Sequence, residues 1–134
     1  MSPPPSQTMI AIDHVQLTMP QGEEDKARAF FAGVLGMEEV PKPKLMADRG
    51  GCWFVSGPVH IHVGVEDDFT PQRKAHPALI VPDLDAMADT LADAGHRVDW
   101  DTLTPERRRF HTDDPFGNRI EFLGEGDGFT QKPW

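Results

Sequence analysis

The sequence predicts an α+β fold built from two copies of one strand-helix-strand-strand-strand module. The first observation is a repeat, because residues 14–20 (HVQLTMP) recur in outline at residues 76–82 (HPALIVP). The second is that each copy runs on through a helix-like stretch to a glycine, Gly36 in one copy and Gly95 in the other. One structural unit therefore stands twice in the chain, and neither copy is large enough to bury its own sheet and helix alone.

A candidate metal ligand follows each of these glycines at the same distance. His62 stands 26 residues beyond Gly36, and Glu121 stands 26 residues beyond Gly95. Both sit in β-rich runs with matching apolar neighbours. Equivalent ligand positions in a repeated module predict a site built by pseudo-symmetry.

The length of 134 residues fits one ordinary hydrophobic core. We therefore expect a single domain over residues 9–124, made of modules 9–66 and 75–124. Residues 1–8, with three successive prolines, predict a disordered tail, and residues 125–134 predict a C-terminal tail.

In the first module, the alternation of residues 9–19 is typical of a half-buried strand. A helix is predicted over residues 23–35 by an acidic start and an apolar stripe. Further strands are predicted at residues 37–40, 51–55 and 60–66, with a Pro/Lys-rich connection before the second of these.

In the second module, a strand is predicted at residues 76–81 and a helix at residues 84–94, with Asp83 as its N-cap. Three more strands are predicted at residues 96–100, 108–112 and 119–123. The Asp-rich turn at residues 113–118 separates the last two.

Composition excludes several classes of protein. The formal net charge of -9 argues against nucleic acid as a partner, because phosphate binding needs a basic surface. No apolar run is long enough to span a membrane. The single Cys52 cannot form an internal disulfide, and we expect it to be a buried small residue rather than a nucleophile. We also expect a cytoplasmic location, because no signal peptide opens the sequence.

Strand parity places the candidate ligands on the strand faces that point away from the predicted helices. In the opening strands, His14 and His76 lie opposite the residues that pack under the helices, and His62 and Glu121 do the same in the closing strands. Three imidazoles and one carboxylate are a plausible ligand set for zinc, nickel, manganese or iron. An antiparallel sheet with one wet face shows the same alternation without any metal, so the repeat is the stronger argument.

Other polar residues leave alternatives open. His60 shares the parity of His62, and register against Glu121 favours His62. We expect His96 on the surface and His111 outside the ligand set. The triplet of arginines at residues 107–109 is interpreted either as a solvated edge or as a clamp for an anionic substrate.

The residues at this point resemble the vicinal oxygen chelate superfamily, which includes glyoxalase I, extradiol dioxygenases, fosfomycin-resistance transferases, methylmalonyl-CoA epimerase and bleomycin-resistance proteins. The resemblance spans residues 10–124. It rests on IDHV at residues 12–15, on AFF at 29–31 with VLGM at 34–37, and most specifically on DDPFGNRIE at 113–121.

The resemblance implies paired βαβββ modules whose sheets curl around a shared cavity, and often a homodimer in which both chains contribute to each site. It also implies a divalent metal held by residues of the first and last strands of the modules, which here are His14, His62, His76 and Glu121.

Departures from the subfamilies bear on the reaction. Glyoxalase I-like enzymes usually have glutamate or glutamine at the position of His62, which leaves Glu121 as ligand and catalytic base. Extradiol dioxygenases and fosfomycin-type transferases use a tyrosine, and this chain has none. The leading hypothesis is a metal-dependent enzyme of lyase, isomerase or dioxygenase type that chelates neighbouring oxygens of a small substrate and stabilises an enediolate or related anion. The alternative is a non-catalytic small-molecule binding or sequestration protein, with Trp53, Trp100, Phe110 and Phe116 as aromatic walls.

Overall fold

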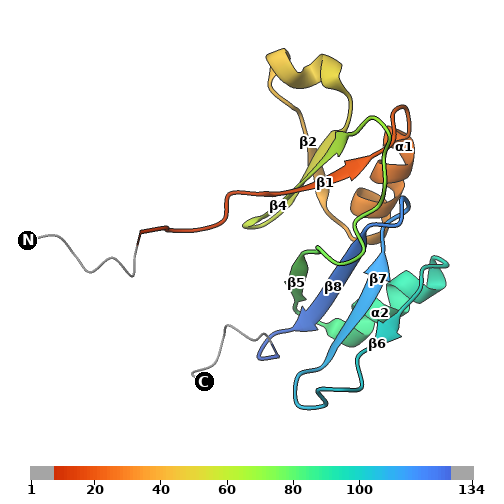
Figure 1. Cartoon of the computed structure of the whole chain (residues 1–134). Helices are drawn as coiled ribbons and strands as arrows, with labels where there is room; N and C mark the ends of the chain where they lie inside the picture. Colours follow the sequence, from red (N-terminus) through yellow and green to blue (C-terminus); the bar gives the residue numbers. More distant parts are fainter. Residues whose placement is uncertain (1–7, 128–134) are drawn as a thin grey trace, which may run out of the picture.

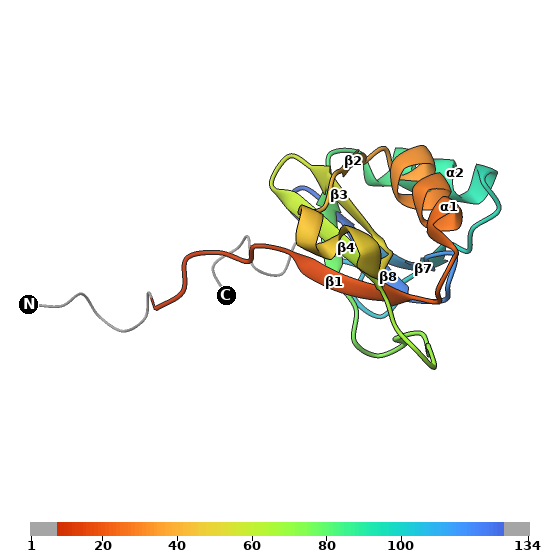
Figure 2. The same ribbon diagram turned by 90° about the horizontal axis from the view of Figure 1, so that it is seen from above.

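The molecule has two four-stranded mixed sheets, and the helices that follow the first strand of each sheet lie on the same side of the molecule (Figures 1 and 2). This computed structural model describes residues 8–127. The α+β class and the two βαβββ modules are confirmed. The sheets stay open and do not close into a barrel.

The first module forms a sheet of strand order β1-β4-β3-β2, in which β1 is parallel to β4 and the other pairs are antiparallel. Its elements are β1 (Val15–Met19), α1 (Glu24–Ala27), the π-helix η2 (Arg28–Val34), β2 (Glu38–Val40), the 3-10 helix η3 (Lys44–Arg49), β3 (Cys52–Ser56) and β4 (Val59–Val65).

The second module repeats that order as β5-β8-β7-β6, again with its first and last strands parallel. Its elements are β5 (Ala78–Val81), α2 (Leu84–Asp93), β6 (Asp99–Trp100), β7 (Arg109–Asp113) and β8 (Arg119–Gly124). The predicted N-cap of α2 is confirmed, because the Asp83 carboxylate accepts a hydrogen bond from the Ala86 backbone amide at 3.0 Å.

Three expectations about local structure change. The first strand begins at Val15 instead of residue 9, because β1 pairs with β4 only from Val15 to Met19 and residues 9–14 have no strand partner among residues 8–127. The first helix is divided into α1 and η2, and the connection after Pro43 contains η3. Residues 1–7 and 128–134 lie outside the described residues, so most of both predicted tails does too.

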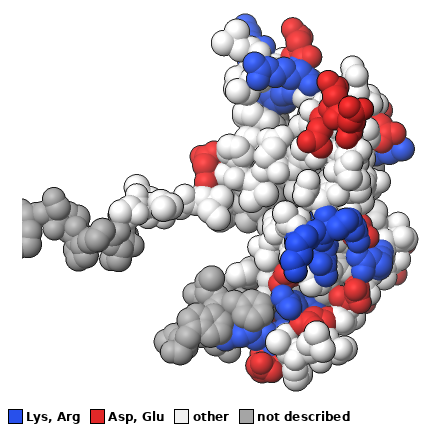
Figure 3. All heavy atoms as spheres, in the orientation of Figure 1, with Lys and Arg blue, Asp and Glu red and all other residues white. Residues whose placement is uncertain are grey.

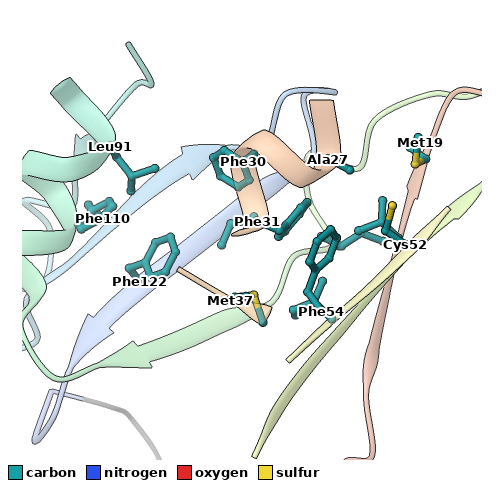
Figure 4. Packing of buried hydrophobic residues seen from close by; sticks show 14 of the residues in the cluster. Met19, Ala27, Phe30, Phe31, Met37, Cys52, Phe54, Leu91, Phe110 and Phe122 are labelled. Atoms are coloured by element: carbon teal, nitrogen blue, oxygen red, sulfur yellow. The ribbon is translucent and has the colours of Figure 1, made fainter. Parts of the chain in front are cut away.

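The core joins the two modules through the helices. Phe31 of η2 packs 5.2 Å from Phe54 of β3 and 5.0 Å from Phe30, measured between ring centroids. On the other sheet, Phe110 and Phe122 lie 5.4 Å apart, and all five rings belong to one buried cluster (Figure 4). Burial of one face of each sheet under the helices leaves the opposite faces, which carry the candidate ligands, for other contacts.

The turn before β8 ties the second module to the first. Asn118 is fully buried, and its side-chain amide donates to the Thr18 carbonyl of β1 and to Asp114, both at 2.8 Å. Its side-chain oxygen accepts from the Gln72 amide of the connecting segment at 3.1 Å. Within residues 8–127 no helix has the length and apolar character that crossing a bilayer requires.

Candidate metal centre

His76 and Glu121 are in direct contact. His76 precedes β5, Glu121 lies in the middle of β8, and β5 pairs with β8 in parallel register at Ala78 and Glu121. This register brings Nε2 of His76 to 2.9 Å from Oε1 of Glu121. Nδ1 of His76 lies 2.7 Å from the Lys74 carbonyl oxygen, so Nδ1 carries the proton of the hydrogen bond. The ring therefore directs Nε2 at the carboxylate.

His111 is the third member of this cluster. It lies on β7 directly opposite Glu121, and its Nε2 is 3.4 Å from the same carboxylate oxygen. The ligand atoms of His76, His111 and Glu121 all lie within 4.8 Å of one another. Among the described residues, these form the one group of three or more potential ligands with that spacing. Two imidazoles and a carboxylate fit a borderline divalent cation such as zinc or iron.

Arg109 holds the other side of the Glu121 carboxylate. Its Nη1 lies 3.2 Å from Oε2 of Glu121, and its Nε lies 2.8 Å from Oδ2 of Asp101. Burial raises the pKa of Glu121, but hydrogen bonds from His76 and Arg109 outweigh it and leave the pKa below its ordinary value. Burial also lowers the pKa of His111. The cluster thus combines an ionised carboxylate with an uncharged imidazole at neutral pH, which are the protonation states of metal ligands.

The equivalent residues of the first module form an aromatic stack. His62 lies between two parallel rings, with Trp53 at 3.9 Å and an interplanar angle of 5°, and His14 at 4.0 Å and 16°. Nδ1 of His14 is 2.8 Å from the Asp13 carboxylate. Burial lowers the pKa of His62. The stack fixes the orientation of His62, which shares the helix-free face of its sheet with His14, as strand parity predicted.

The two modules differ at one position beside these clusters. Gly51 stands two residues before Trp53, as Arg109 stands two residues before His111. Gly51 has φ of 83°, and a Cβ there would lie 2.2 Å from the Val63 carbonyl oxygen. The first module therefore has no room for a counterpart of Arg109.

Within one chain, the four predicted ligands form two separate pairs. His14 and His62 line a groove of about 840 Å³ on the first sheet, together with Trp53 of β3 and Met46 of η3. His76 lines a different groove, between β1 and the segment that leads into β5. Neither His14 nor His62 belongs to the cluster around Glu121. A single chain therefore brings together His76 with Glu121, and His14 with His62.

The remaining candidates fall into structural roles. Arg108 pairs with Asp85 at 2.8 Å and lies over the Trp100 ring, so it stabilises the α2–β6 side of the module. Arg109, by contrast, borders the cluster of His76, His111 and Glu121. His60 is exposed beside the first-module groove, and His96 packs against Phe30 at 4.9 Å.

Of the four predicted aromatic walls, Trp53 lines the first-module groove. Phe110 is fully buried in the core, Trp100 packs on Phe110, and Phe116 packs on Phe69. Cys52 is buried as expected, and burial raises the pKa of its thiol to about 11.

Sequence reasoning set His111 aside, although one signal pointed to it. The turn between β7 and β8 sets the register of this hairpin, in which Asp113 is opposite Arg119 and His111 is opposite Glu121. The predicted strands at 108–112 and 119–123 flank this turn. Pairing their ends, residues 112 and 119, would have placed His111 opposite Ile120, one residue away from its actual partner Glu121.

Comparison with known proteins agrees with this architecture. Residues 16–123 match the model of the glyoxalase-like domain family. No curated protein sequence matches the chain. A crystal structure of a glyoxalase family protein from Bacillus anthracis is 47% identical, with a TM-score of 0.83 over 87% of this chain and 95% of that one.

More distant structures share the fold. The fosfomycin resistance protein FosX from Listeria monocytogenes is 15% identical, with a TM-score of 0.69 over 87% of this chain and 93% of that one. TnmS3, an antibiotic binding protein from Streptomyces sp. CB03234, is 23% identical, with a TM-score of 0.65 over 87% of this chain and 98% of that one. The family match and the repeated βαβββ architecture agree, and the chain belongs to the glyoxalase-like domain family and has the vicinal oxygen chelate fold.

Proposed function

We propose that this protein is a metal-dependent enzyme of the cytoplasm that acts on a small, oxygen-rich substrate as a lyase, an isomerase or a dioxygenase. The observation that supports it best is the His76–Glu121 pair with its oriented imidazole and ionised carboxylate. Membership in the glyoxalase-like domain family supports a small-molecule ligand. Zinc, nickel, manganese and iron all accept this donor set.

In the proposed site, His76 and Glu121 hold the metal from one side and His14 and His62 complete the four-residue set. A metal bound there would polarise two neighbouring oxygens of a substrate and stabilise negative charge that develops on them. Glu121 is the proposed proton acceptor as well as a ligand. Arg109 keeps its carboxylate in place by binding Oε2.

The proposed site needs a second copy of the chain. The helices α1, η2 and α2 lie on the same side of the molecule (Figure 2), and the groove that His14 and His62 line includes neither His76 nor Glu121. A homodimer in which the first module of one chain covers the second module of its partner would bring His14 and His62 to His76 and Glu121. Two such sites would form in one dimer with closed symmetry.

The test is metal analysis and turnover with matched variants. Protein purified without chelator is expected to contain close to one divalent metal per chain and to lose it when His76 or Glu121 is changed to alanine. His96→Ala is the control, because His96 lies outside both clusters. Metal-free wild-type protein from every preparation, even after incubation with each of the four metals, contradicts the proposal.

A second candidate function is binding without catalysis. The first-module groove favours it, because the flat stack of Trp53, His62 and His14 offers an apolar planar surface beside Met46. The structural neighbour TnmS3 is an antibiotic binding protein. Turnover of vicinal dicarbonyl, hydroxycarbonyl or catechol compounds separates the two functions, since a sequestering protein would bind such a compound and release it unchanged.

A further inference from the structure

We infer that His111 is a metal ligand and that His76, His111 and Glu121 form a three-residue metal-binding cluster within the second module of a single chain. This inference rests on the proposed function only in requiring a metal. It deepens the proposed site by adding a ligand from β7, so that the second module supplies three donors before a second copy brings His14 and His62 to the metal.

The distances between donor atoms suit one small cation. A zinc ion bound at about 2.0–2.2 Å by nitrogen and oxygen ligands in tetrahedral geometry separates those ligands by about 3.3 Å. Nε2 of His76 and Nε2 of His111 lie 2.9 Å and 3.4 Å from the same oxygen, Oε1 of Glu121. No rearrangement of β5, β7 or β8 is needed, because backbone pairing already sets these positions.

The hydrogen bonds around His76 favour a cation between these atoms. The Lys74 carbonyl lies 2.7 Å from Nδ1 and holds the ring so that Nε2 points at Oε1 of Glu121, 2.9 Å away. A hydrogen bond that orients the imidazole through its other ring nitrogen is the usual arrangement of a metal-ligating histidine.

The two oxygens of Glu121 have different surroundings, as expected of a carboxylate that binds a metal through one oxygen. Oε1 faces both imidazoles, whereas Oε2 accepts from Arg109. Arg109 is itself held by Asp101, whose Oδ2 lies 2.8 Å from Nε. This chain of contacts orients Glu121 from behind and leaves Oε1 directed at the histidines.

The burial of the cluster and the difference between the two modules also support the inference. Glu121 and His111 are buried at 4% and 8% exposure, so the cluster is not a chance meeting of surface side chains. At the position of His111, the first module has Trp53, which cannot bind a metal. The second module alone therefore has three donors, and the first module supplies at most two.

The experiment compares zinc affinity of the full-length chain and its variants by competition with a chromophoric chelator. We expect His111→Ala to weaken Zn²⁺ binding by more than about 100-fold, which exceeds the 10- to 100-fold effect of losing an outer partner of a ligand. The double variant His14→Ala/His62→Ala is expected to bind Zn²⁺ more weakly than wild type but to keep measurable binding through the three residues of the second module. His96→Ala is the control for loss of a histidine outside the cluster.

A second measurement covers the case in which His111→Ala does not fold. X-ray absorption of Zn²⁺ bound to the folded His14→Ala/His62→Ala variant counts the imidazoles at the metal directly, and the inference requires two. His111→Gln, checked by circular dichroism, provides a polar replacement of closer size.

Each outcome separates the inference from the proposed function. Wild-type affinity in folded His111→Ala overturns the inference and leaves the four-residue site standing. Loss of Zn²⁺ binding in the double variant overturns it in the same way. If wild-type protein binds none of the four metals, both fail. Normal Zn²⁺ binding by His76, His111 and Glu121 without turnover of any substrate supports the inference. That result contradicts only the proposed enzymatic function.

Discussion

The Asn118 side-chain amide donates to the Thr18 carbonyl at 2.8 Å, across 100 residues of sequence, and so fastens the turn before β8 to the first strand of the other module. Asn118 also accepts from the Gln72 amide and donates to Asp114. This one buried side chain connects both modules and the segment between them. The β7–β8 hairpin, which carries His111 and Glu121, therefore has a fixed position relative to β1.

Asn118→Ala should destabilise the protein by about 2–4 kcal/mol, because it leaves the Thr18 carbonyl and the Gln72 amide without their buried partner. Urea unfolding followed by circular dichroism measures the change. Asp89→Ala, at an exposed position of α2, serves as the control and should change the free energy of unfolding by less than about 0.5 kcal/mol. Equal effects of the two substitutions would refute the role assigned to Asn118.

Trp53 should report metal at His62. The two rings stack at 3.9 Å, so Co²⁺ bound to the His62 imidazole is expected to quench the Trp53 fluorescence. The measurement uses a Trp100→Phe/Trp134→Phe background, in which Trp53 is the one remaining tryptophan. In that background His62→Ala should abolish the quenching, and His96→Ala should retain it. If the proposed dimer completes the site, His76→Ala should also reduce the quenching.

Cys52 should be unreactive in the folded protein. Burial raises the pKa of its thiol from 9.0 to about 11, and its exposed fraction is 1%. The shift alone lowers the thiolate fraction at pH 8 by about 100-fold, since each pKa unit is a factor of ten. Thiol titration with a disulfide reagent in buffer and in denaturing urea measures the ratio of rates. Rapid reaction in buffer would show that the core opens around β3.

The contribution of Asp113 to stability should depend on pH. Burial raises the pKa of this carboxyl, but hydrogen bonds from Arg97 and Arg73 outweigh it and leave the pKa below its ordinary value. Because the folded-state pKa is the lower one, the stabilisation is present above the unfolded pKa of about 3.9 and is lost as the pH falls through the folded value.

Asp113→Asn should therefore cost about 0.5–1 kcal/mol at pH 7, the size expected of a partly exposed ion-pair group. The difference from wild type should shrink as the pH falls below the unfolded pKa of about 3.9 and disappear once the pH is below the lower folded-state pKa. Thermal unfolding of both proteins across this range provides the test. A difference that persists at low pH means that Asp113 acts through its hydrogen bonds to neutral groups and not through its charge.

Much of the fold and part of the site followed from the sequence. The repeat located both modules, and strand parity placed His14 and His62 on one face and brought His76 to Glu121. Parity describes the two faces of a strand, but it does not say which strands are neighbours. His111 was missed for this reason, because its contact with Glu121 depends on the register across the β7–β8 turn.

The start of β1 was misplaced for a related reason. The alternation of residues 9–14 is that of a strand, but a strand also needs a neighbour to pair with, and β4 begins its pairing at Val15. Neither could the sequence indicate that His14 and His62 lie in a different groove from His76, since this depends on how the two sheets are placed. Pairing within each module was predictable, whereas the arrangement of the modules was not.

Gly51 makes the difference between the modules difficult to reverse. A gene duplication produces two identical halves. Either half can later acquire the functional residues of the other as long as single substitutions can introduce them. With the Val63 carbonyl only 2.2 Å from where a Cβ would stand, no side chain fits at Gly51 unless β3 and β4 move apart. A glutamate in place of His62 would thus lack the basic neighbour that Arg109 gives Glu121. The difference between the two halves at this position is therefore held by the main chain.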